Sequence, residues 1–319
     1  MYILDYHLFN LELKESLPVV NSNIYSRKGI YLTLKKNGSI QAIAEASPLP
    51  GLSKESLETV LKIIQKIILA SPQFTLHSLD KNILELNKYP SLQFALNTLY
   101  LQLNSTIKSS KVKTHTFIKK ICTNTPFENK YIKYKIGLNN INNDISNINK
   151  IIKVHPDMKF RLDANFRLSL KQLCFFFSKI KKENIDYIED PCKIENLNEF
   201  YNLTNINYAL DTPSINIEKP DNLNGLSALI VKPSLIGTVN NINNLKKKFN
   251  VKRIVLSSSY ETKIGIQGLL NYAQIISPQE IHGLNTEHFF KYFINKTPVS
   301  EIKSTSIQDM YKWMLNNGS

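Results

Sequence analysis

The sequence is poor in cysteine, tryptophan and arginine. Its 319 residues include 3 cysteines and 1 tryptophan, and the arginines among the 40 basic residues are Arg27, Arg161, Arg167 and Arg253. The cysteines (Cys122, Cys174 and Cys192) do not have the spacing of metal ligands, and their odd number argues against a disulfide framework. We therefore expect a protein of a reducing compartment, stabilised by an ordinary apolar core.

Long apolar runs are also lacking. The segment Val60–Ala70 is interrupted by Lys62 and Lys66, and it is shorter than the ~20 apolar residues that a membrane-spanning helix needs. The first residues, with Asp5 and Glu12, lack the charged-then-apolar order of a secretory signal. We predict a cytoplasmic protein with no membrane partner.

The net charge of +14 is typical of proteins that bind nucleic acids. Almost all the basic residues are lysines, however, whereas recognition of bases and phosphates favours the bidentate guanidinium group of arginine. The lysines are scattered among many asparagines and isoleucines, three residue types with A/T-rich codons. Genome composition explains this bias as well as function does, and we expect no nucleic-acid partner.

The first hundred residues indicate an α+β region. Predicted strands are Ile24–Leu34 and Ile40–Ala46, and predicted helices are Leu57–Leu69, with Ser53 as its cap, and Ser91–Leu103. Asn37-Gly38 between the two strands is typical of a hairpin turn. The polar stretch Asn104–Lys113 has no periodicity and is predicted to be a linker.

From about residue 114, strand-like and helix-like segments alternate. The predicted strands are Ile132–Ile136, Lys159–Ala164, Asp186–Glu189, Tyr208–Asp211, Ala228–Lys232, Arg253–Ser257 and a short one near Ile281–Leu284; the predicted helices are Ile141–Val154, Leu168–Lys181, Val239–Phe249 and Ile264–Ile276. Such alternation favours parallel pairing and a closed (β/α) barrel. The tail Phe289–Ser319 is predicted to pack back on the first domain, with Trp313 and Met314 as apolar anchors.

Polar side chains end most of these predicted strands, at the edge where barrel active sites form. They are Lys133 and Lys135 on the first strand, then Asp163, Glu189, Asp211 and Lys232, and the run Ser257-Ser258-Ser259. A charge at a strand end is most often merely solvated. Here each charge follows a strongly apolar run, where an isolated buried charge would be costly.

The three carboxylates indicate a site for a divalent metal ion. Asp163, Glu189 and Asp211 end successive strands and are 26 and 22 residues apart. Because neighbouring strands lie ~5 Å apart, their side chains can converge. Oxygen ligands without histidine or cysteine suit Mg²⁺, with Mn²⁺ as a substitute.

The lysines indicate acid–base chemistry beside that ion. Lys133 and Lys135 are two residues apart and face the barrel interior. Two adjacent ammonium groups disfavour each other's charge, which lowers a lysine pKa and provides a base near neutral pH. Lys232 lies three strands beyond Asp163, roughly across the barrel mouth. This arrangement suits abstraction of a proton α to a carboxylate, with the metal stabilising the enediolate.

These motifs resemble the o-succinylbenzoate synthase family, in the muconate-lactonizing subgroup of the enolase superfamily. The similarity is carried in collinear order by Ser26-Arg27-Lys28-Gly29, residues 45–53, Pro90-Ser91, residues 133–138, 161–165, 189–193 and 232–237, residues 257–261, and Gly283-Leu284-Asn285-Thr286. The barrel motifs are typical of the superfamily. The Ser-Pro-Leu-Pro-Gly loop and the Arg-Leu-Asp-Ala-Asn strand favour the synthases within it.

The resemblance implies a (β/α)7β modified TIM barrel with an α+β capping domain built from both chain ends. The implied division is 1–110 for the N-terminal capping region, 111–288 for the barrel and 289–319 for the C-terminal tail. The resemblance also implies Mg²⁺ at Asp163, Glu189 and Asp211. Lys135 would be the base, which Lys133 would tune, and Lys232 would stabilise the enediolate.

The implied activity is a lyase reaction of menaquinone biosynthesis. In it, 2-succinyl-6-hydroxy-2,4-cyclohexadiene-1-carboxylate loses water in a syn dehydration and gives o-succinylbenzoate. The implied partner is a small-molecule carboxylate substrate, with the chain acting as a monomer or weak homo-oligomer. One departure is notable, because the family commonly has Asp-Glu-Ser at the third metal ligand and this chain has Asp211-Thr212-Pro213.

Candidate substrate-binding residues are Arg27, Arg161, Asn165, Ser257, Ser258 and Gly283. Each arginine has a second interpretation, namely a surface charge for Arg27 and an interior salt bridge for Arg161. Asn165 would bond to the catalytic centre or merely turn the strand end. The serines would offer hydroxyls and backbone N–H groups to a carboxylate or form a solvated turn.

Two other functions remain open. N-acylamino acid racemases and dipeptide epimerases use the same scaffold, metal and lysines, but need both Lys135 and Lys232 as acid and base. The alternative outside enzymes is a decayed scaffold or a basic binding protein.

Overall fold

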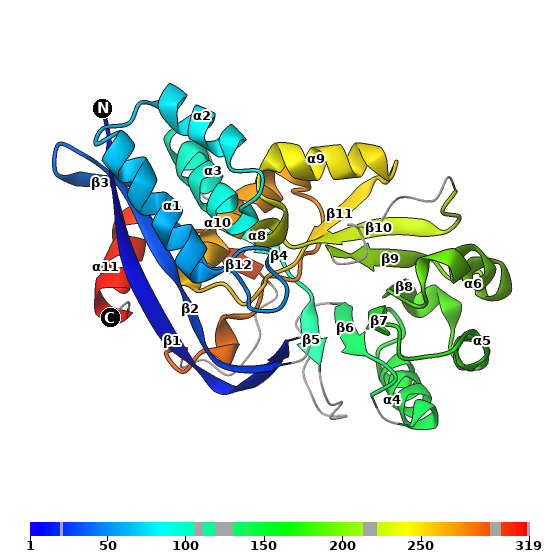
Figure 1. The fold of residues 1–319 in the computed structure, drawn as a ribbon. Coiled ribbons are helices and arrows are strands. Elements are labelled where there is room, and N and C mark those ends of the chain that lie inside the picture. Colours follow the sequence, from blue (N-terminus) through cyan, green and yellow to red (C-terminus); the bar gives the residue numbers. More distant parts are fainter. Residues whose placement is uncertain are drawn as a thin grey trace.

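The computed structural model describes residues 1–19, 22–104, 111–118, 130–138, 140–212, 222–293 and 301–317. An antiparallel sheet with helices packed beside it forms one part, and a parallel sheet ringed by helices forms the other (Figure 1). The first part holds β1 (Ile3–Val19), β2 (Ser22–Lys36), β3 (Ser39–Ala46), α1 (Leu57–Ala70), α2 (Leu76–Glu85) and α3 (Pro90–Asn104). We call this first part the cap.

The cap sheet has the order β1-β2-β3 and a two-sided core. Asn37 and Gly38 both have positive φ, which confirms the predicted hairpin turn between β2 and β3. The helix predicted after the loop is confirmed, but Ser56 caps it, and Ser53 instead accepts a hydrogen bond from the Leu49 N–H. The predictions missed β1 and α2.

The barrel strands are β5 (Thr116–Ile118), β6 (Tyr131–Lys135), β7 (Lys159–Asp163), β8 (Ile185–Glu189), β9 (Tyr208–Asp211), β10 (Leu226–Val231) and β11 (Arg253–Leu256). They form one sheet in sequence order, with every pairing parallel. The segments between them include α4 (Ile141–Val154), α5 (Leu170–Phe177), α6 (Leu197–Thr204), α8 (Pro233–Ile236), α9 (Val239–Lys248) and α10 (Lys263–Ile276). Short 3₁₀ turns occupy Lys182–Asn184, Ile194–Asn196 and Glu287–Phe289.

The segment His282–Gly283 closes the sheet into a barrel. The His115 N–H donates to the His282 carbonyl, and the Gly283 N–H donates to the Leu256 carbonyl, so this segment lies between the first and last strands. The predicted short strand near Ile281–Leu284 is thus present as an eighth barrel position. Together with the cap, this confirms the predicted modified TIM barrel.

The C-terminal segment returns to the cap (Figure 1). β12 (Glu301–Lys303) pairs antiparallel with β4 (Lys111–Lys113), and α11 (Ile307–Asn317) packs against β3. Met310 and Met314 are buried among cap residues, while the Trp313 ring meets Tyr31 edge-on. These contacts agree with the predicted anchors. The domain boundaries 1–110, 111–288 and 289–319 stay predictions.

The predicted linker is wrong at its end, because Lys111–Lys113 form β4 through their pairing with β12. Residues 105–110 of that linker, Cys122 and Pro213 lie outside the described residues. In the described part of the chain, no helix is both long and apolar enough to cross a membrane.

Candidate active site

Parallel register places Lys135, Asp163 and Glu189 in one layer at the carboxyl ends of the strands. Lys135 is the register partner of Asp163, and Asp163 is that of Glu189 on the next strand. Asp211 ends β9, which pairs with β8, and Lys232 directly follows β10. The carboxyl ends of adjacent strands therefore carry these side chains to one mouth of the barrel, as predicted.

Ion pairs join these carboxylates to Lys135 and Lys232, and also to Lys133, which is the register partner of Arg161 one layer closer to the amino ends of the strands. Lys133 Nζ lies 3.3 Å from Asp163 Oδ2 and also contacts the Glu189 carboxylate. Lys135 Nζ lies 3.9 Å from the same Asp163 oxygen, and Lys232 Nζ contacts both oxygens of Asp211. The Glu189 side chain is almost fully buried, and its Oε1 has no hydrogen-bond partner.

The two neighbouring lysines have opposite electrostatic environments. Burial would lower the pKa of Lys133, but Glu189, Asp163 and Asp211 hold that pKa well above its ordinary value. For Lys135, burial and the nearby positive charges of Lys133 and Arg167 outweigh the attraction of Asp163, so its pKa is lowered. Lys135 is the member of the pair that loses its proton more readily.

The carboxylates at the strand ends have the donor chemistry that a divalent metal ion needs. Asp163, Glu189 and Asp211 present carboxylate oxygens from three adjacent strands, which is the donor chemistry of Mg²⁺. The buried, unpartnered Glu189 Oε1 is a further free acceptor. As the side chains stand, the described residues contain no group of acidic, histidine or cysteine side chains close enough to hold an ion. Lys133 and Lys232 instead pair with the carboxylates.

Arg161 lies one layer closer to the amino ends of the strands. Its side chain is fully buried, with Nε 2.8 Å from Asp186 Oδ2 and Nη2 2.7 Å from Glu280 Oε1. Arg253 pairs with the same two acids, at 2.8 and 2.9 Å. Asp186 is near the amino end of β8, and Glu280 lies in the loop after α10. Arg161 therefore forms an interior salt bridge with these two acids. Its contacts support the salt-bridge interpretation, whereas binding of the substrate by Arg161 stays a prediction.

Arg27 is also buried, and its guanidinium group donates hydrogen bonds to backbone carbonyls of the protein. Its Nε donates to the Tyr260 carbonyl at 3.0 Å, and Nη2 donates to the Ser47 carbonyl at 2.8 Å. A third hydrogen bond goes from Nη1 to the Pro48 carbonyl. Arg27 is therefore neither a surface charge nor a free anchor, because its donors join the cap loop to the barrel loop at Tyr260.

The remaining candidates lie at strand ends. Asn165 is exposed and has a left-handed φ of 43° just after β7, which agrees with turning the strand end. Ser257 is half-buried and forms a bridge to Gly283, where an added Cβ would come 3.0 Å from the His115 ring. The Ser258 hydroxyl donates to Glu261 at 2.6 Å. Ser257, Ser258 and Gly283 are thus brought together at the mouth.

Thr212, which follows the third carboxylate, is buried and turned away from the cluster. Its Oγ1 donates to the Ile230 carbonyl and accepts the Lys232 N–H, at 3.0 and 2.8 Å. Thr212 thus ties the end of β9 to the end of β10. The departure from the usual glutamate provides a strand-end link that also positions the Lys232 backbone.

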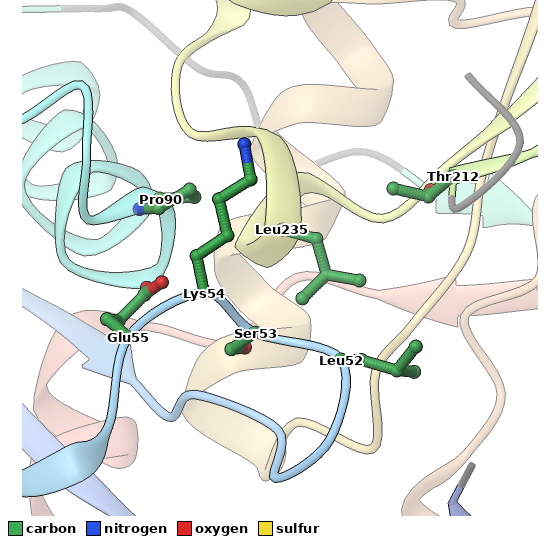
Figure 2. Close-up of a pocket in the computed structure, with 7 residues that line it drawn as sticks. All are labelled: Leu52, Ser53, Lys54, Glu55, Pro90, Thr212 and Leu235. Atoms are coloured by element: carbon green, nitrogen blue, oxygen red, sulfur yellow. The ribbon is translucent and has the colours of Figure 1, made fainter. Parts of the chain in front are cut away.

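A small pocket lies between the cap loop and the strand ends (Figure 2). Its volume is about 210 Å³, and it is lined by Leu52, Ser53, Lys54, Glu55, Pro90, Thr212 and Leu235. Figure 2 shows Lys54 extending from the cap loop beside Leu235 and Pro90. A larger cavity of about 620 Å³ is lined by residues 24–28 and by cap-loop residues between Pro48 and Leu57. The smaller pocket therefore lies next to Thr212, the residue that follows Asp211.

The sequence interpretation missed Glu45 and Glu261 as site-building residues. Both are almost fully buried where cap and barrel meet, and Glu45 accepts hydrogen bonds from Thr262 and Gly265 at the start of α10. The only signal was the position of Glu261 two residues after the serine run 257–259. No sequence spacing reveals Glu45, because its partners lie 217 and 220 residues away.

The fold, a parallel barrel with an α+β cap, is also that of solved enzyme structures, among them a muconate lactonizing enzyme from Pseudomonas fluorescens with a TM-score of 0.67 and 12% identity, which covers 94% of this chain and 91% of that chain. No protein-family model matches the chain. Among curated relatives, the chain is 27% identical to the o-succinylbenzoate synthase of Vibrio cholerae over 304 residues, with 89% of each chain covered. It is also 27% identical to that of Haemophilus influenzae over 332 residues, covering 95% of this chain and 97% of the relative.

Solved structures show the same fold. The o-succinylbenzoate synthase of Thermosynechococcus elongatus, complexed with Mg in the active site, has a TM-score of 0.75 and 15% identity, and 98% and 99% of the chains are covered. A dipeptide epimerase from Enterococcus faecalis, complexed with Mg and L-Leu-L-Tyr, has a TM-score of 0.72 and 17% identity, with 95% and 97% covered. The predicted resemblance to o-succinylbenzoate synthases is confirmed, and so is the prediction of an enzyme rather than a decayed scaffold.

Proposed function

We propose that the chain is an o-succinylbenzoate synthase, which converts 2-succinyl-6-hydroxy-2,4-cyclohexadiene-1-carboxylate to o-succinylbenzoate and water in menaquinone biosynthesis. The observation that carries this proposal is the convergence of three acidic and three basic side chains at one barrel mouth. The full-length similarity to synthases supports it. We place this activity in the cytoplasm, in a monomer or weak homo-oligomer.

In the proposed mechanism, Lys135 removes the proton from the ring carbon that bears the carboxylate. The lowered pKa of Lys135 leaves a larger neutral fraction to accept that proton. The same ammonium group then protonates the departing hydroxide, so the proton and the hydroxyl leave from one face as water. The ring becomes aromatic, and no redox partner is needed.

The other charged residues handle the negative charge that develops on the substrate. Lys133, which stays protonated beside Glu189 and Asp163, holds the carboxylate and keeps a positive charge near Lys135. Lys232 provides a second ammonium group from the other side of the mouth. Asp163, Glu189 and Asp211 would hold Mg²⁺, which when bound neutralises charge on the carboxylate oxygens. Mn²⁺ is the expected substitute.

The test is an absorbance assay of the cyclohexadiene substrate with metal-stripped protein. We expect turnover only after Mg²⁺ is added, and a loss of about 10²–10⁴-fold in kcat for Lys135→Ala. The control is Lys159→Ala, a lysine at the amino end of β7 whose Nζ bonds to a backbone carbonyl. Absence of turnover in folded, Mg²⁺-bound protein would contradict the proposal.

Epimerisation of an N-acylamino acid or dipeptide is the second candidate. It is favoured by the presence of lysines on both sides of the carboxylates and by the fold of the dipeptide epimerase. The two functions differ in what Lys232 must do, since dehydration needs one base and epimerisation needs two. Deuterium exchange in D₂O separates them. With an N-succinylamino acid, the wild type would exchange the α-proton of both enantiomers for deuterium. Exchange of only one enantiomer in Lys232→Ala would favour epimerisation.

A further inference from the structure

Glu261 is a buried carboxylate in the loop that follows the last barrel strand. It lies between β11 and α10 and is 1% exposed. One oxygen accepts hydrogen bonds from the Ser258 hydroxyl and the Ser259 N–H, both at 2.6 Å. The other oxygen accepts the Ser234 hydroxyl at 2.7 Å. The burial cost of this charge is thus offset by three donors from two strand-end segments.

Those two segments carry residues of the proposed active site. Ser234 is the second residue after Lys232, and its hydroxyl also lies 3.2 Å from the Ser259 hydroxyl. The serines 257–259 directly follow β11, the strand next to β10. Glu261 therefore links the segment that carries Lys232 and Ser234 to the serine segment 257–259.

The cap holds the residues on either side of Glu261. Arg27 donates to the Tyr260 carbonyl at 3.0 Å, and Glu45 accepts the Thr262 N–H at 3.0 Å. Both cap side chains are almost fully buried, at 1% and 2% exposure. The loop that carries Glu261 is therefore fixed from the cap as well as from the barrel.

We propose that Glu261 is a positioning residue that aligns Lys232 with the serine segment, and that Arg27 and Glu45 fix it from the cap. The inference rests on the proposed function, because it concerns how that site is held in register. A carboxylate suits this task, since its two oxygens accept several donors at once and bring both segments to one point. Ser234 is the contact that transmits this alignment to Lys232.

Ser234→Ala is the variant that tests the link to Lys232. It removes one hydroxyl and leaves every proposed catalytic and metal-binding group in place. We expect kcat to fall about tenfold, with KM changed by less than about twofold, because a small displacement of a charge-stabilising group weakens transition-state contacts most. The control is Ser227→Ala. Ser227 lies at the amino end of β10, the end away from Lys232, and its hydroxyl donates to the Tyr208 carbonyl on β9.

Glu261→Gln tests whether Glu261 and Ser234 affect Lys232 through the same hydrogen bond. The amide oxygen still accepts the Ser258 and Ser259 donors, but the amide NH₂ faces Ser234 and the charge-assisted bond is lost. We expect a fall in kcat similar to that of Ser234→Ala. In the double variant, kcat should be no more than about twofold below either single variant, because that hydrogen bond is already lost.

Three results would overturn the proposal. The first is a kcat within twofold of wild type for Ser234→Ala, and the second is an equal loss in the Ser227→Ala control. The third is a double variant in which the two losses multiply. Thermal melting of each variant ensures that kinetics are compared below unfolding.

Hydrogen exchange separates this inference from the proposed function. If the wild-type chain turns over none of the proposed substrates, the function fails, yet the alignment is still measurable. We then expect faster amide exchange in residues 234–237 and 257–260 of both variants, with no change at the amino end of β10. Unchanged exchange in both segments would refute the positioning role.

Discussion

Replacing Arg161 with methionine tests the ion-pair network that Arg161 and Arg253 form with Asp186 and Glu280 inside the barrel. The two arginines and two acids there form a neutral group, in which Arg161 is 0% exposed. Its side chain also lies over the Tyr131 and Tyr187 rings, 5.2 and 5.1 Å from their centroids. Arg161→Met keeps much of this packing but leaves Arg253 as the one cation that pairs with Asp186 and Glu280 among the described residues.

The expected loss of stability follows from the net charge left behind. Removing one partner of a buried ion pair costs about 3–5 kcal/mol, because an uncompensated charge stays in the interior. With an unfolding entropy of about 2.1 cal/mol/K per residue, a chain of 319 residues has about 670 cal/mol/K. A loss of about 4 kcal/mol therefore lowers Tm by about 6 °C if the chain unfolds as one unit.

Calorimetry and steady-state kinetics together decide the role of Arg161. We expect the Tm to fall while KM and kcat stay within about twofold of wild type at a temperature well below the transition. Arg253→Met is the matched control, and it should cost less because the Arg253 side chain is 32% exposed. A tenfold rise in KM with an unchanged Tm would refute this reasoning and favour Arg161 as a substrate anchor.

Three further predictions concern acid, the cap and the metal. Burial would raise the pKa of Glu280, but Arg253 and Arg161 lower that pKa to about 2. The stabilisation by the ionised Glu280 is therefore complete above about pH 4.5 and is lost as the pH falls toward 2. Urea unfolding at several pH values measures this loss. Glu45→Gln should cost about 1–3 kcal/mol, measured by urea unfolding, because an amide cannot accept all of the donors now facing Glu45. At about a hundred times its Kd, Mg²⁺ should stabilise the protein by about 2.7 kcal/mol in a thermal-shift titration, and Asp163→Asn should abolish the shift.

The strand-end cluster could be predicted because its signal is local. Each of Asp163, Glu189 and Asp211 is the last residue of a short strand, and the strands lie side by side in chain order. Register then aligns Asp163 with Glu189, and Asp211 follows two residues beyond Ala209, the register partner of Glu189. Most barrel elements begin and end within a few residues of their predictions, and the helix Ile141–Val154 matches its prediction at both ends.

The roles of the arginines could not be predicted because their partners are remote in the chain. Arg161 bonds to Asp186 and Glu280, which are 25 and 119 residues away, so both interpretations of the sequence were equally consistent with its place on the strand. Arg27 bonds across 233 residues. β1 (Ile3–Val19) was missed for another reason, since a bulge between Glu12 and Leu17 interrupts its pairing with β2.

The packing of α11 on the cap has a consequence for how the chain is made. Phe9, Leu11 and Tyr31 leave the ribosome early, yet they share a core with Met310 and Met314, which follow the whole barrel. The strands of the cap sheet are therefore synthesised before the barrel, but their core is completed only after the barrel has been made. Until then, one apolar face of the nascent sheet stays uncovered while the barrel strands emerge, which is the period when aggregation and chaperone binding compete with folding.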